Sequence, residues 1–170
     1  MFQIGDLVVY GRTGICEIVD ITTMDIAGVP KDRLYYILMP QHNKSGKIFT
    51  PVESDKVIIR PIISQEEAES LIDRIPDLEV FVITNEKMRE MRYKECLRSS
   101  QCEDYVRIIK TIYMRKQERL SIGKRITATD EKYLKMAESS LYAELSAVLG
   151  IPEKDMESYL IERIEHKSGH

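Results

Sequence analysis

The sequence predicts an α+β protein of two domains, a small antiparallel β-barrel followed by a bundle of four to five α-helices. Residues 1–63 contain short runs rich in Val, Ile, Tyr and Thr, separated by turn-forming stretches. From Ser64 onward, apolar residues recur at helical spacing instead. A chain of 170 residues is also long enough for two small compact domains. The change of pattern at Ser64 therefore predicts domains 1–63 and 64–170.

Five strands are expected in the first domain, each a run of β-branched and aromatic residues. They span 7–11, 14–24, 34–40, 47–52 and 56–62. The intervening stretches "GRTG", "AGVPKD" and "HNKSG" contain the Gly, Pro, Asn and Asp that favour turns. Five such short strands in one small domain predict a strongly bent antiparallel barrel.

The first expected helix, 65–74, begins after Ser64 in the sequence "SQEE". This spacing is typical of a capping box, in which the serine hydroxyl and the carboxylate of Glu67 satisfy each other's backbone amides. Pro76 cannot continue a helix and disfavours helical geometry at the residue before it. The first helix is therefore expected to end before this proline.

The second expected helix, 86–99, has two different faces when successive residues are placed 100° apart. The face predicted to join the core contains Arg89, Tyr93, Cys96 and Leu97. The opposite face contains Lys87, Met88, Met91, Lys94 and Arg98. Bases combined with methionines suit contact with phosphates and with an adaptable apolar surface. Alternatively, the methionines pack on a neighbouring helix while the long basic side chains extend around them.

Three more helices are expected after Ser100. The spacing of Ser100 to Glu103 repeats the capping-box pattern, which predicts the start of the third helix. The fourth helix is expected to begin near Thr127 and to end at Gly150, a residue that favours helix C-termini. A last short helix is expected over 152–165.

The net charge of −3 hides a local excess of bases. Residues 87–125 contain twelve bases and five acids, whereas the segments on either side are net acidic. Such an excess can attract phosphates within a Debye length of roughly 8 Å, but charge runs also serve as solvated helix faces. A second basic group lies at an expected helix end and loop and consists of Arg115, Lys116, Arg119, Lys124 and Arg125. Bases at a helix C-terminus also complement the helix dipole.

Composition argues against a membrane protein and against a disulfide-bonded one. No apolar run approaches the ~18 residues that a membrane span requires. The start, "MFQIGDLVVYG", lacks the pattern of an export signal, so a cytoplasmic location is expected. Cys16, Cys96 and Cys102 form no CxxC pair and are expected to be buried, reduced thiols.

Neither a metal site nor a catalytic centre is expected. The three histidines, His42, His166 and His170, have no second ligand at helical spacing nearby. No nucleophile and base pair, phosphate-binding glycine loop or carboxylate pair stands out. We therefore expect a monomeric, non-enzymatic protein without a cofactor.

Four stretches together resemble the CarD/CdnL family of bacterial transcription regulators. They are "IGDLVVYGRTGICEI", "IFTPVES", "MRYKECL" and "RKQERLSIGKRITATDEKYLKMAESSL", in the order and spacing of the family from Gly5 to about Leu149. The N-terminal module is also similar to the polymerase-interacting domain of transcription-repair coupling factor. The resemblance implies a Tudor-like barrel that binds the β subunit of RNA polymerase and a helical domain that contacts upstream promoter DNA. It further implies that the protein modulates the stability of the open promoter complex.

The resemblance implies a polymerase-binding edge on the barrel, where main-chain pairing provides affinity and side chains provide specificity. The matching positions are Met24, Lys47, Phe49 and Pro51. Relatives place bases where this chain has Met24 and Phe49, so a more apolar partner surface is expected, although Phe49 could equally be a core aromatic. Gly11 and Thr13 stand where the family often has Pro and His, which predicts a different loop shape.

The resemblance also implies that the helical domain contacts DNA, mainly through phosphates. Several relatives insert a tryptophan into the minor groove, whereas this sequence contains none and has Arg89 at the matching position. An apolar wedge kinks a base step, but an arginine can only read a narrow, electronegative groove, so a weaker or different interaction is expected. The predicted DNA-contacting residues are Lys87, Met88, Arg89, Met91, Lys94, Arg98, Arg115, Lys116, Arg119, Lys124 and Arg125. The alternative is a protein adaptor on RNA polymerase that does not bind DNA.

Overall fold

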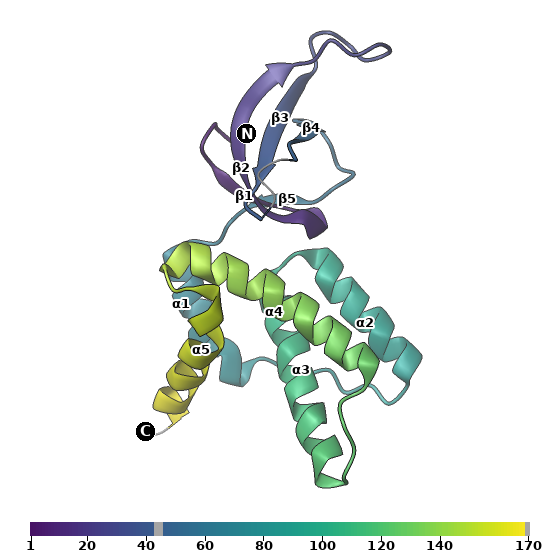
Figure 1. Cartoon of the computed structure of the whole chain (residues 1–170), viewed down its shortest axis with the longest axis vertical. Helices are drawn as coiled ribbons and strands as arrows, with labels where there is room; N and C mark the ends of the chain where they lie inside the picture. The colour runs from purple at the N-terminus through teal and green to yellow at the C-terminus, as the bar shows by residue number, and fades with distance from the viewer. Residues whose placement is uncertain (43–45, 169–170) are drawn as a thin grey trace. The chain divides into compact units, whose positions relative to one another are not determined.

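The computed structural model describes residues 1–42 and 46–168. The chain forms two compact units, Met1–Ile62 and Ile63–His170, each with its own hydrophobic core. The first contains the strands and the second contains the helices (Figure 1). Part of the expected turn "HNKSG" and the C-terminal His170 lie outside the described residues.

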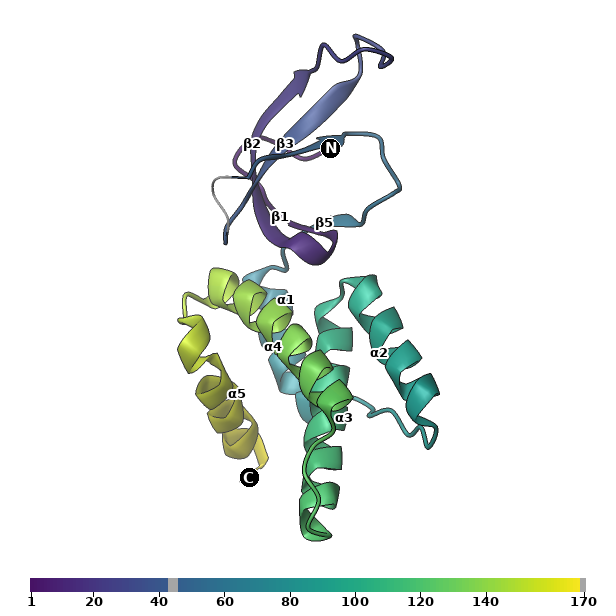
Figure 2. The same cartoon turned by 45° about the vertical axis from the view of Figure 1, so that its right-hand side comes forward.

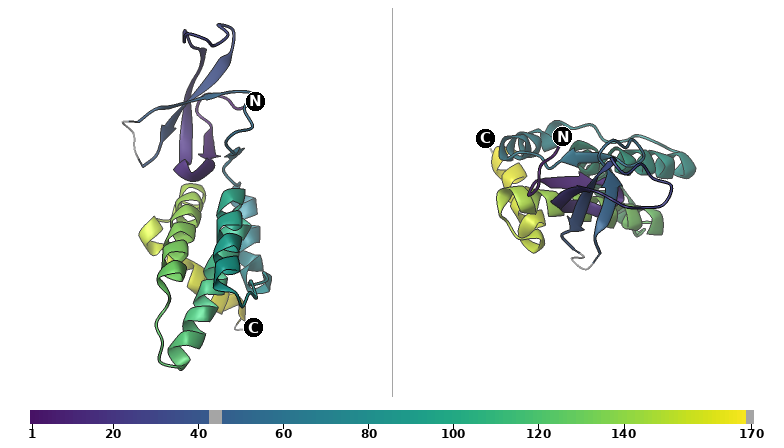
Figure 3. Two further views of the ribbon diagram at one scale, coloured as in Figure 1. Left: turned by 90° about the vertical axis from the view of Figure 1, so that its right-hand side faces the viewer. Right: turned by 90° about the horizontal axis from the view of Figure 1, so that it is seen from above.

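The N-terminal unit is a five-stranded antiparallel sheet in the order β4, β3, β2, β1, β5. The strands are β1 (Leu7–Tyr10), β2 (Gly14–Thr23), β3 (Leu34–Pro40), β4 (Ile48–Pro51) and β5 (Ile59–Pro61). The sequence predicted all five, with ends that differ from these by up to three residues. Strands β2 and β3 form the long central hairpin, visible from two directions in Figures 1 and 3.

The prediction of a closed barrel was wrong, because the sheet remains open. Strands β4 and β5 are its two edges, and no ladder joins them within the described residues. They contain only four and three residues, and residues 52–58 between them form no strand. Closure requires every strand to pair on both sides, and these short edges pair on one side only.

The main buried cluster of this unit lies on one face of the sheet, and Val9, Ile15 and Tyr35 are buried outside it. The cluster's fully buried members are Val8, Cys16, Ile18, Tyr36 and Leu38. A register shift between Ile18 and Asp20 interrupts the pairing of β2 with β3, and such bulges bend a strand. The Tyr36 hydroxyl accepts a hydrogen bond from the Phe2 amide at 3.0 Å, which ties the N-terminal segment to the core.

The backbone at Gly11 cannot accommodate proline, the residue that the family often has at this position. It begins the short 3-10 turn Gly11–Thr13, with φ of +45° and an N–H that donates to the Ile58 carbonyl at 2.8 Å. Proline has φ near −65° and no N–H, so it can satisfy neither requirement. The observed conformation at Gly11 is thus one that proline cannot adopt, and a loop shape different from that of the family stays a prediction.

Replacing Gly11 with alanine is expected to destabilise the N-terminal unit by about 1 to 3 kcal/mol. The new Cβ would lie 2.7 Å from Val57 Cγ1, and a positive φ is unfavourable for alanine. Urea unfolding followed by amide resonances of the sheet measures the loss. Gly28→Ala is the matched control, because Gly28 also has a positive φ but its Cβ would meet nothing within 4 Å. Equal losses in the two variants would contradict a role for the Val57 contact.

Within residues 63–168, the part of the C-terminal unit that the structure describes, there are five helices (Figure 2). They are α1 (Gln65–Arg74), α2 (Glu86–Ser99), α3 (Cys102–Ser121), α4 (Ala128–Leu149) and α5 (Glu153–Ser168), with a short 3-10 turn at Ile75–Asp77. The capping box at the start of α1 is confirmed, since the Ser64 hydroxyl accepts from the Glu67 amide and the Glu67 carboxylate accepts from the Ser64 amide. Helix α4 starts after Thr127 and ends at Gly150 in the left-handed conformation, as predicted.

All five helices contribute to one hydrophobic core. Its large buried aliphatic members include Ile72 from α1, Ile108 and Ile112 from α3, Leu141 and Leu145 from α4, and Met156 from α5. The predicted thiols Cys96 and Cys102 are buried here, and Cys16 is buried in the sheet. None of the described helices is long and apolar enough to cross a membrane.

The predicted capping box at Ser100 was wrong. Ser100 instead ends α2 with φ of +58° and is almost fully buried, and Gln101 is the residue that precedes α3. The chain must reverse direction between two packed helices within these two residues, which requires a left-handed backbone. Ser99 takes part of the capping role, because its hydroxyl accepts from the Gln101 amide and lies 2.7 Å from Asp104 Oδ2.

Candidate functional site

Strand β4 is an open edge whose two faces differ. Thr50 and Ile48 face the core, where Thr50 is buried and Ile48 packs against the cluster around Tyr36. Lys47, Phe49 and Pro51 alternate with them and lie on the other face. The Phe49 side chain is 49% exposed. Phe49 is therefore a surface aromatic, which decides between the two interpretations that the sequence left open.

The main chain of β4 also offers hydrogen-bonding groups to a partner. The Val52 amide donates to the Leu34 carbonyl of β3 at 3.0 Å. Because antiparallel residues alternate between facing the neighbouring strand and facing away, the Phe49 N–H and carbonyl point to the open side. Pro51 points the same way, where its missing N–H removes no bond of the ladder. This edge can accept an added strand.

The surroundings of Phe49 are largely apolar. It pairs across the ladder with Ile37, and Pro51 pairs with Tyr35. The Arg33 guanidinium lies over the Tyr35 ring, 5.8 Å from its centroid. Of the other predicted polymerase-contacting residues, Lys47 is exposed directly before β4, and Met24 is half-buried directly after β2. The structure thus brings three of the four residues together on one edge strand and its flank, and places Met24 at the end of another strand.

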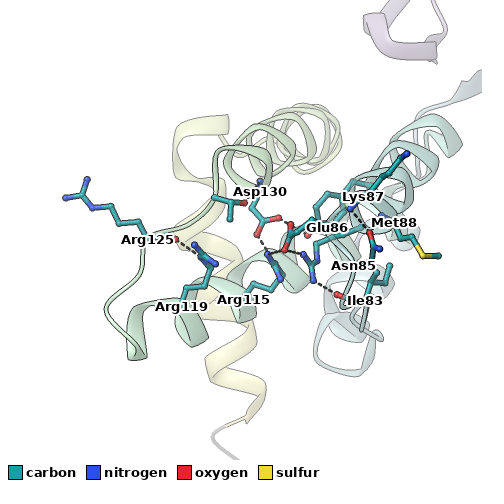
Figure 4. Close-up of polar contacts among 12 residues, drawn as sticks. Ile83, Asn85, Glu86, Lys87, Met88, Arg115, Arg119, Arg125 and Asp130 are labelled. Carbon is teal, nitrogen blue, oxygen red and sulfur yellow. Dashed lines mark hydrogen bonds and ion pairs between the residues drawn. The ribbon is translucent and has the colours of Figure 1, made fainter.

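The two faces predicted for α2 are confirmed. Its buried residues are Arg89, Tyr93, Cys96 and Leu97. The predicted opposite face is exposed along its length and consists of Lys87, Met88, Met91, Lys94 and Arg98. Met88 and Met91 remain 60% and 56% exposed, so they do not pack on a neighbouring helix of this chain. Figure 4 shows Lys87 and Met88 pointing away from the polar contacts at the start of α2.

Arg89 and Arg115 make their contacts inside the helical unit. Arg89 is only 6% exposed, and its guanidinium contacts the Glu86 carboxylate and the Ile83 carbonyl. Arg115 donates through Nε to Asp130 at 2.8 Å and through Nη2 to Glu86 at 3.3 Å (Figure 4). An arginine held in this way is not presented to a DNA groove. We therefore assign both residues a structural role in place of the predicted DNA contact.

Asp130 is the buried centre of this polar cluster. It lies in the first turn of α4, is fully buried, and accepts hydrogen bonds from Arg115 and from the Tyr93 hydroxyl at 3.1 Å. Burial, reinforced by the nearby Asp130 charge, raises the pKa of Tyr93. Hydrogen bonding to Arg89 lowers the pKa of Glu86. The cluster joins α2, α3 and α4, and so it sets which face of α2 is exposed.

The end of α3 and the following loop form a second exposed basic segment, which projects beyond α2 and α5 in Figures 1 and 3. Gly123 has φ of +74°, its N–H donates to the Leu120 carbonyl, and the Lys124 N–H donates to the Arg119 carbonyl. This pair of bonds is the Schellman motif of helix C-termini. Arg119 Nε also donates to the Arg125 carbonyl at 2.6 Å, so Arg119 closes the loop (Figure 4).

Two exposed apolar residues in this segment were missed by the sequence reasoning. Leu120 and Ile122 flank Ser121 at the end of α3, and both are exposed. The signal in the sequence was "LSIG", in which apolar residues directly precede a helix-ending glycine. Their neighbours Lys124 and Arg125 are exposed as well. The projecting loop therefore combines apolar and basic side chains.

Eight of the eleven predicted DNA-contacting residues have exposed side chains. The other three, Arg89, Arg115 and Arg119, contact neighbouring groups of the helical unit. Among the exposed residues, Lys94 forms a surface ion pair with Glu90 at 3.7 Å. Within residues 1–42 and 46–166, no group of three or more His, Cys, Asp and Glu side chains is arranged to hold a metal ion.

A comparison with known protein families finds a match for the N-terminal sheet domain. Residues 2–63 match the CarD-like/TRCF RID domain family. No curated protein matches the chain. The matched segment contains all five strands and ends directly before the capping serine of α1. The family match therefore covers the N-terminal sheet domain, residues 2–63, and supports an RNA polymerase-interacting domain of the CarD-like/TRCF type there.

Proposed function

We propose that this protein is a non-enzymatic transcription regulator with two contact surfaces. Strand β4 binds the β subunit of RNA polymerase, and the helical unit contacts upstream promoter DNA. Through both contacts the protein modulates the stability of the open promoter complex. The observation that carries this proposal is the unpaired edge of an RNA polymerase-interacting domain, on which Phe49 is exposed. A polymerase partner also agrees with a cytoplasmic location.

The composition of the edge supports the polymerase contact. An exposed edge strand usually carries charges or is covered, because its unpaired N–H and carbonyl groups otherwise attract other chains. Strand β4 instead presents the exposed Phe49 and the half-exposed Pro51 on its outer face, next to the exposed base Lys47. Aromatic residues dominate the energy of many protein interfaces. An apolar edge of this kind suits a permanent strand-pairing partner.

The distribution of exposed bases supports the DNA contact. The proposed contact residues are those with exposed side chains, namely Lys87, Met88, Met91, Lys94, Arg98, Lys116, Lys124 and Arg125. They lie on the outer face of α2, on the end of α3 and on the loop after it. Such bases contact phosphates, which fix position without reading sequence. The choice of promoter would then depend on the polymerase.

Calorimetry with the full chain and the purified lobe of the polymerase β subunit tests the main claim. We expect saturable binding at one protein per lobe. A titration without heat change, repeated at two temperatures to avoid a zero enthalpy, would contradict the polymerase assignment. The complete chain is used because the helical unit can contribute to the affinity.

Reversing two exposed charges, as in Lys124→Glu with Arg125→Glu, is expected to weaken the effect on promoter-complex lifetime at low salt. Each phosphate contact contributes about 0.9 to the slope of log affinity against log salt concentration. Losing two contacts should therefore reduce the slope by about 2. Competition-based lifetime measurements on a polymerase and promoter complex at several salt concentrations give this slope.

The control for this experiment reverses two exposed charges elsewhere in the helical unit, as in Lys135→Glu with Lys154→Glu. Both residues are exposed and lie outside the proposed contact surface. The control changes the net charge by the same amount, so only an effect specific to the loop after α3 distinguishes the two variants. If both pairs of reversals shorten the lifetime equally, the proposed phosphate contacts are wrong.

A second candidate function is a protein adaptor on RNA polymerase that does not bind DNA. The exposed apolar residues Met88, Met91 and Val82 favour it, because methionine-rich surfaces suit adaptable protein contacts. Electrophoretic mobility shifts with the purified chain and fork-junction DNA separate the two functions. A salt-sensitive shift supports the regulator, whereas its absence at low salt supports the adaptor.

A further inference from the structure

A cavity of about 400 Å³ lies among α3, α4 and α5, and none of its lining residues is among those proposed to contact polymerase or DNA. Its wall is almost entirely apolar and includes Val106, Ile109, Leu141, Leu160, Ile161 and Ile164. The helices that supply this wall are labelled in Figure 2. Ligand-binding cavities in proteins commonly have volumes of roughly 300 to 1,000 Å³ and apolar walls with a few polar groups.

Two carboxylates lie at Tyr113, one from Glu157, which lines the cavity, and one from Glu138, which does not. The Tyr113 hydroxyl lies 2.7 Å from Glu157 Oε1 and 3.3 Å from Glu138 Oε1. A tyrosine hydroxyl donates only one hydrogen bond, so it cannot satisfy both carboxylates while both are ionised. Burial and the Glu157 charge raise the pKa of Glu138, against the opposing effects of the Tyr113 hydrogen bond and of Lys116. Within residues 1–42 and 46–166, neither carboxylate forms an ion pair.

The base that lines the cavity cannot serve an anionic ligand. Lys110 Nζ donates to the carbonyls of Ile75, Pro76 and Leu78 at 2.8, 2.8 and 2.7 Å. An ammonium group has three donors, and these three bonds use all of them. A ligand carboxylate would have to displace one of these bonds. The Glu157 carboxylate, in contrast, lines the cavity and can accept further hydrogen bonds beside the one from Tyr113.

We propose that this cavity binds a small amphipathic organic cation, such as an alkylamine. Its apolar part lies against the aliphatic wall, and its ammonium group lies at Glu157, with Glu138 behind the Tyr113 hydroxyl. The rings of Tyr113 and Tyr142, which both line the cavity, add attraction for a cation. This binding site is independent of the proposed contacts with polymerase and DNA.

The proposal is tested with three probes that have the same number of carbon atoms and different head groups, namely octylammonium, octanol and octanoate. Each is titrated into the full chain at neutral pH and followed by isoleucine methyl resonances. We expect octylammonium to bind at least about tenfold more tightly than octanol, a difference of about 1.4 kcal/mol, and octanoate to bind most weakly. Equal affinities for octylammonium and octanol, or no binding of any probe, would overturn the proposal.

The variant Glu157→Gln tests whether the head group binds at Glu157, because it removes the carboxylate without changing the apolar wall of the cavity. Because Glu157 is exposed, the variant is expected to fold, to bind octanol as before and to lose most of the preference for octylammonium. Glu131→Gln is the matched control. It removes the same charge from α4, where Glu131 pairs with Lys135 at 3.4 Å and does not line the cavity. A similar loss of preference in both variants would show a general charge effect and overturn the assigned site.

Discussion

Replacing Asp130 with alanine is expected to destabilise the helical unit by about 3 to 5 kcal/mol, the usual effect of removing one partner of a buried ion pair. Asp130 is fully buried and accepts hydrogen bonds from Arg115 and Tyr93. Without it, the Tyr93 hydroxyl and Arg115 Nε lose their acceptor in a region with little access to water, and Arg115 keeps only its contact with Glu86. Such unpaired buried groups account for most of the loss.

Guanidinium unfolding followed by far-ultraviolet circular dichroism measures this loss. Glu131→Ala is the control, because Glu131 occupies the next position of α4 and is exposed, so its loss is expected to stay below about 1 kcal/mol. Asp130→Asn keeps an acceptor for Tyr93 but loses the charge that faces Arg115, and it should fall between the two. If Asp130→Ala is no less stable than Glu131→Ala, the cluster does not hold α2, α3 and α4 together.

Replacing Phe49 with alanine is expected to weaken binding to the polymerase β lobe by at least about 2 kcal/mol, the size typical of an interface hot spot. Phe49 is the exposed aromatic residue of the open edge, and its removal leaves the ladder with β3 intact. Phe49→Pro tests the main chain as well. Proline removes the outward N–H that an added strand would use, at a position where the sheet itself uses no such donor.

Calorimetry against the β lobe measures both Phe49 variants, with amide spectra to verify that the sheet is folded. Val82→Ala is the control, because Val82 is the most exposed large aliphatic residue described and lies outside the sheet. We expect its affinity to equal that of the native chain. Polymerase binding that survives both changes at Phe49 would place the contact on another surface of the N-terminal domain.

Local sequence signals predicted most of the secondary structure. The capping box at Ser64, the cap at Thr127 and the glycine at 150 each act within a few residues, and each has its expected geometry. The two faces of α2 followed from helical periodicity, although Arg89 was predicted both on the buried face and in contact with DNA. Ser100 is the exception, because the same short pattern that starts a helix here lies where a preceding helix ends.

Long-range pairing explains what was not predicted. The sheet closes only if β4 pairs with β5. The local sequence does not indicate how many residues of these two strands pair with a neighbour. The contact of Arg115 with Asp130 joins α3 to α4 across a loop. Both residues look like ordinary surface charges in the sequence, since a buried partner becomes visible only when the helices are packed. The same holds for the Tyr113, Glu138 and Glu157 group, which comes from three helices.

The sequence by itself determined the strands, the helices, the exposed and buried faces of α2 and the resemblance of the N-terminal domain, because periodicity, caps and motifs are properties of neighbouring residues. Only the tertiary structure decided which charges are available to a partner. Arg89 and Arg115 became structural once Glu86 and Asp130 were placed beside them, whereas Lys124 and Arg125 remained exposed. The physical reason is that desolvation and pairing depend on three-dimensional neighbours, and these are set by how the helices pack.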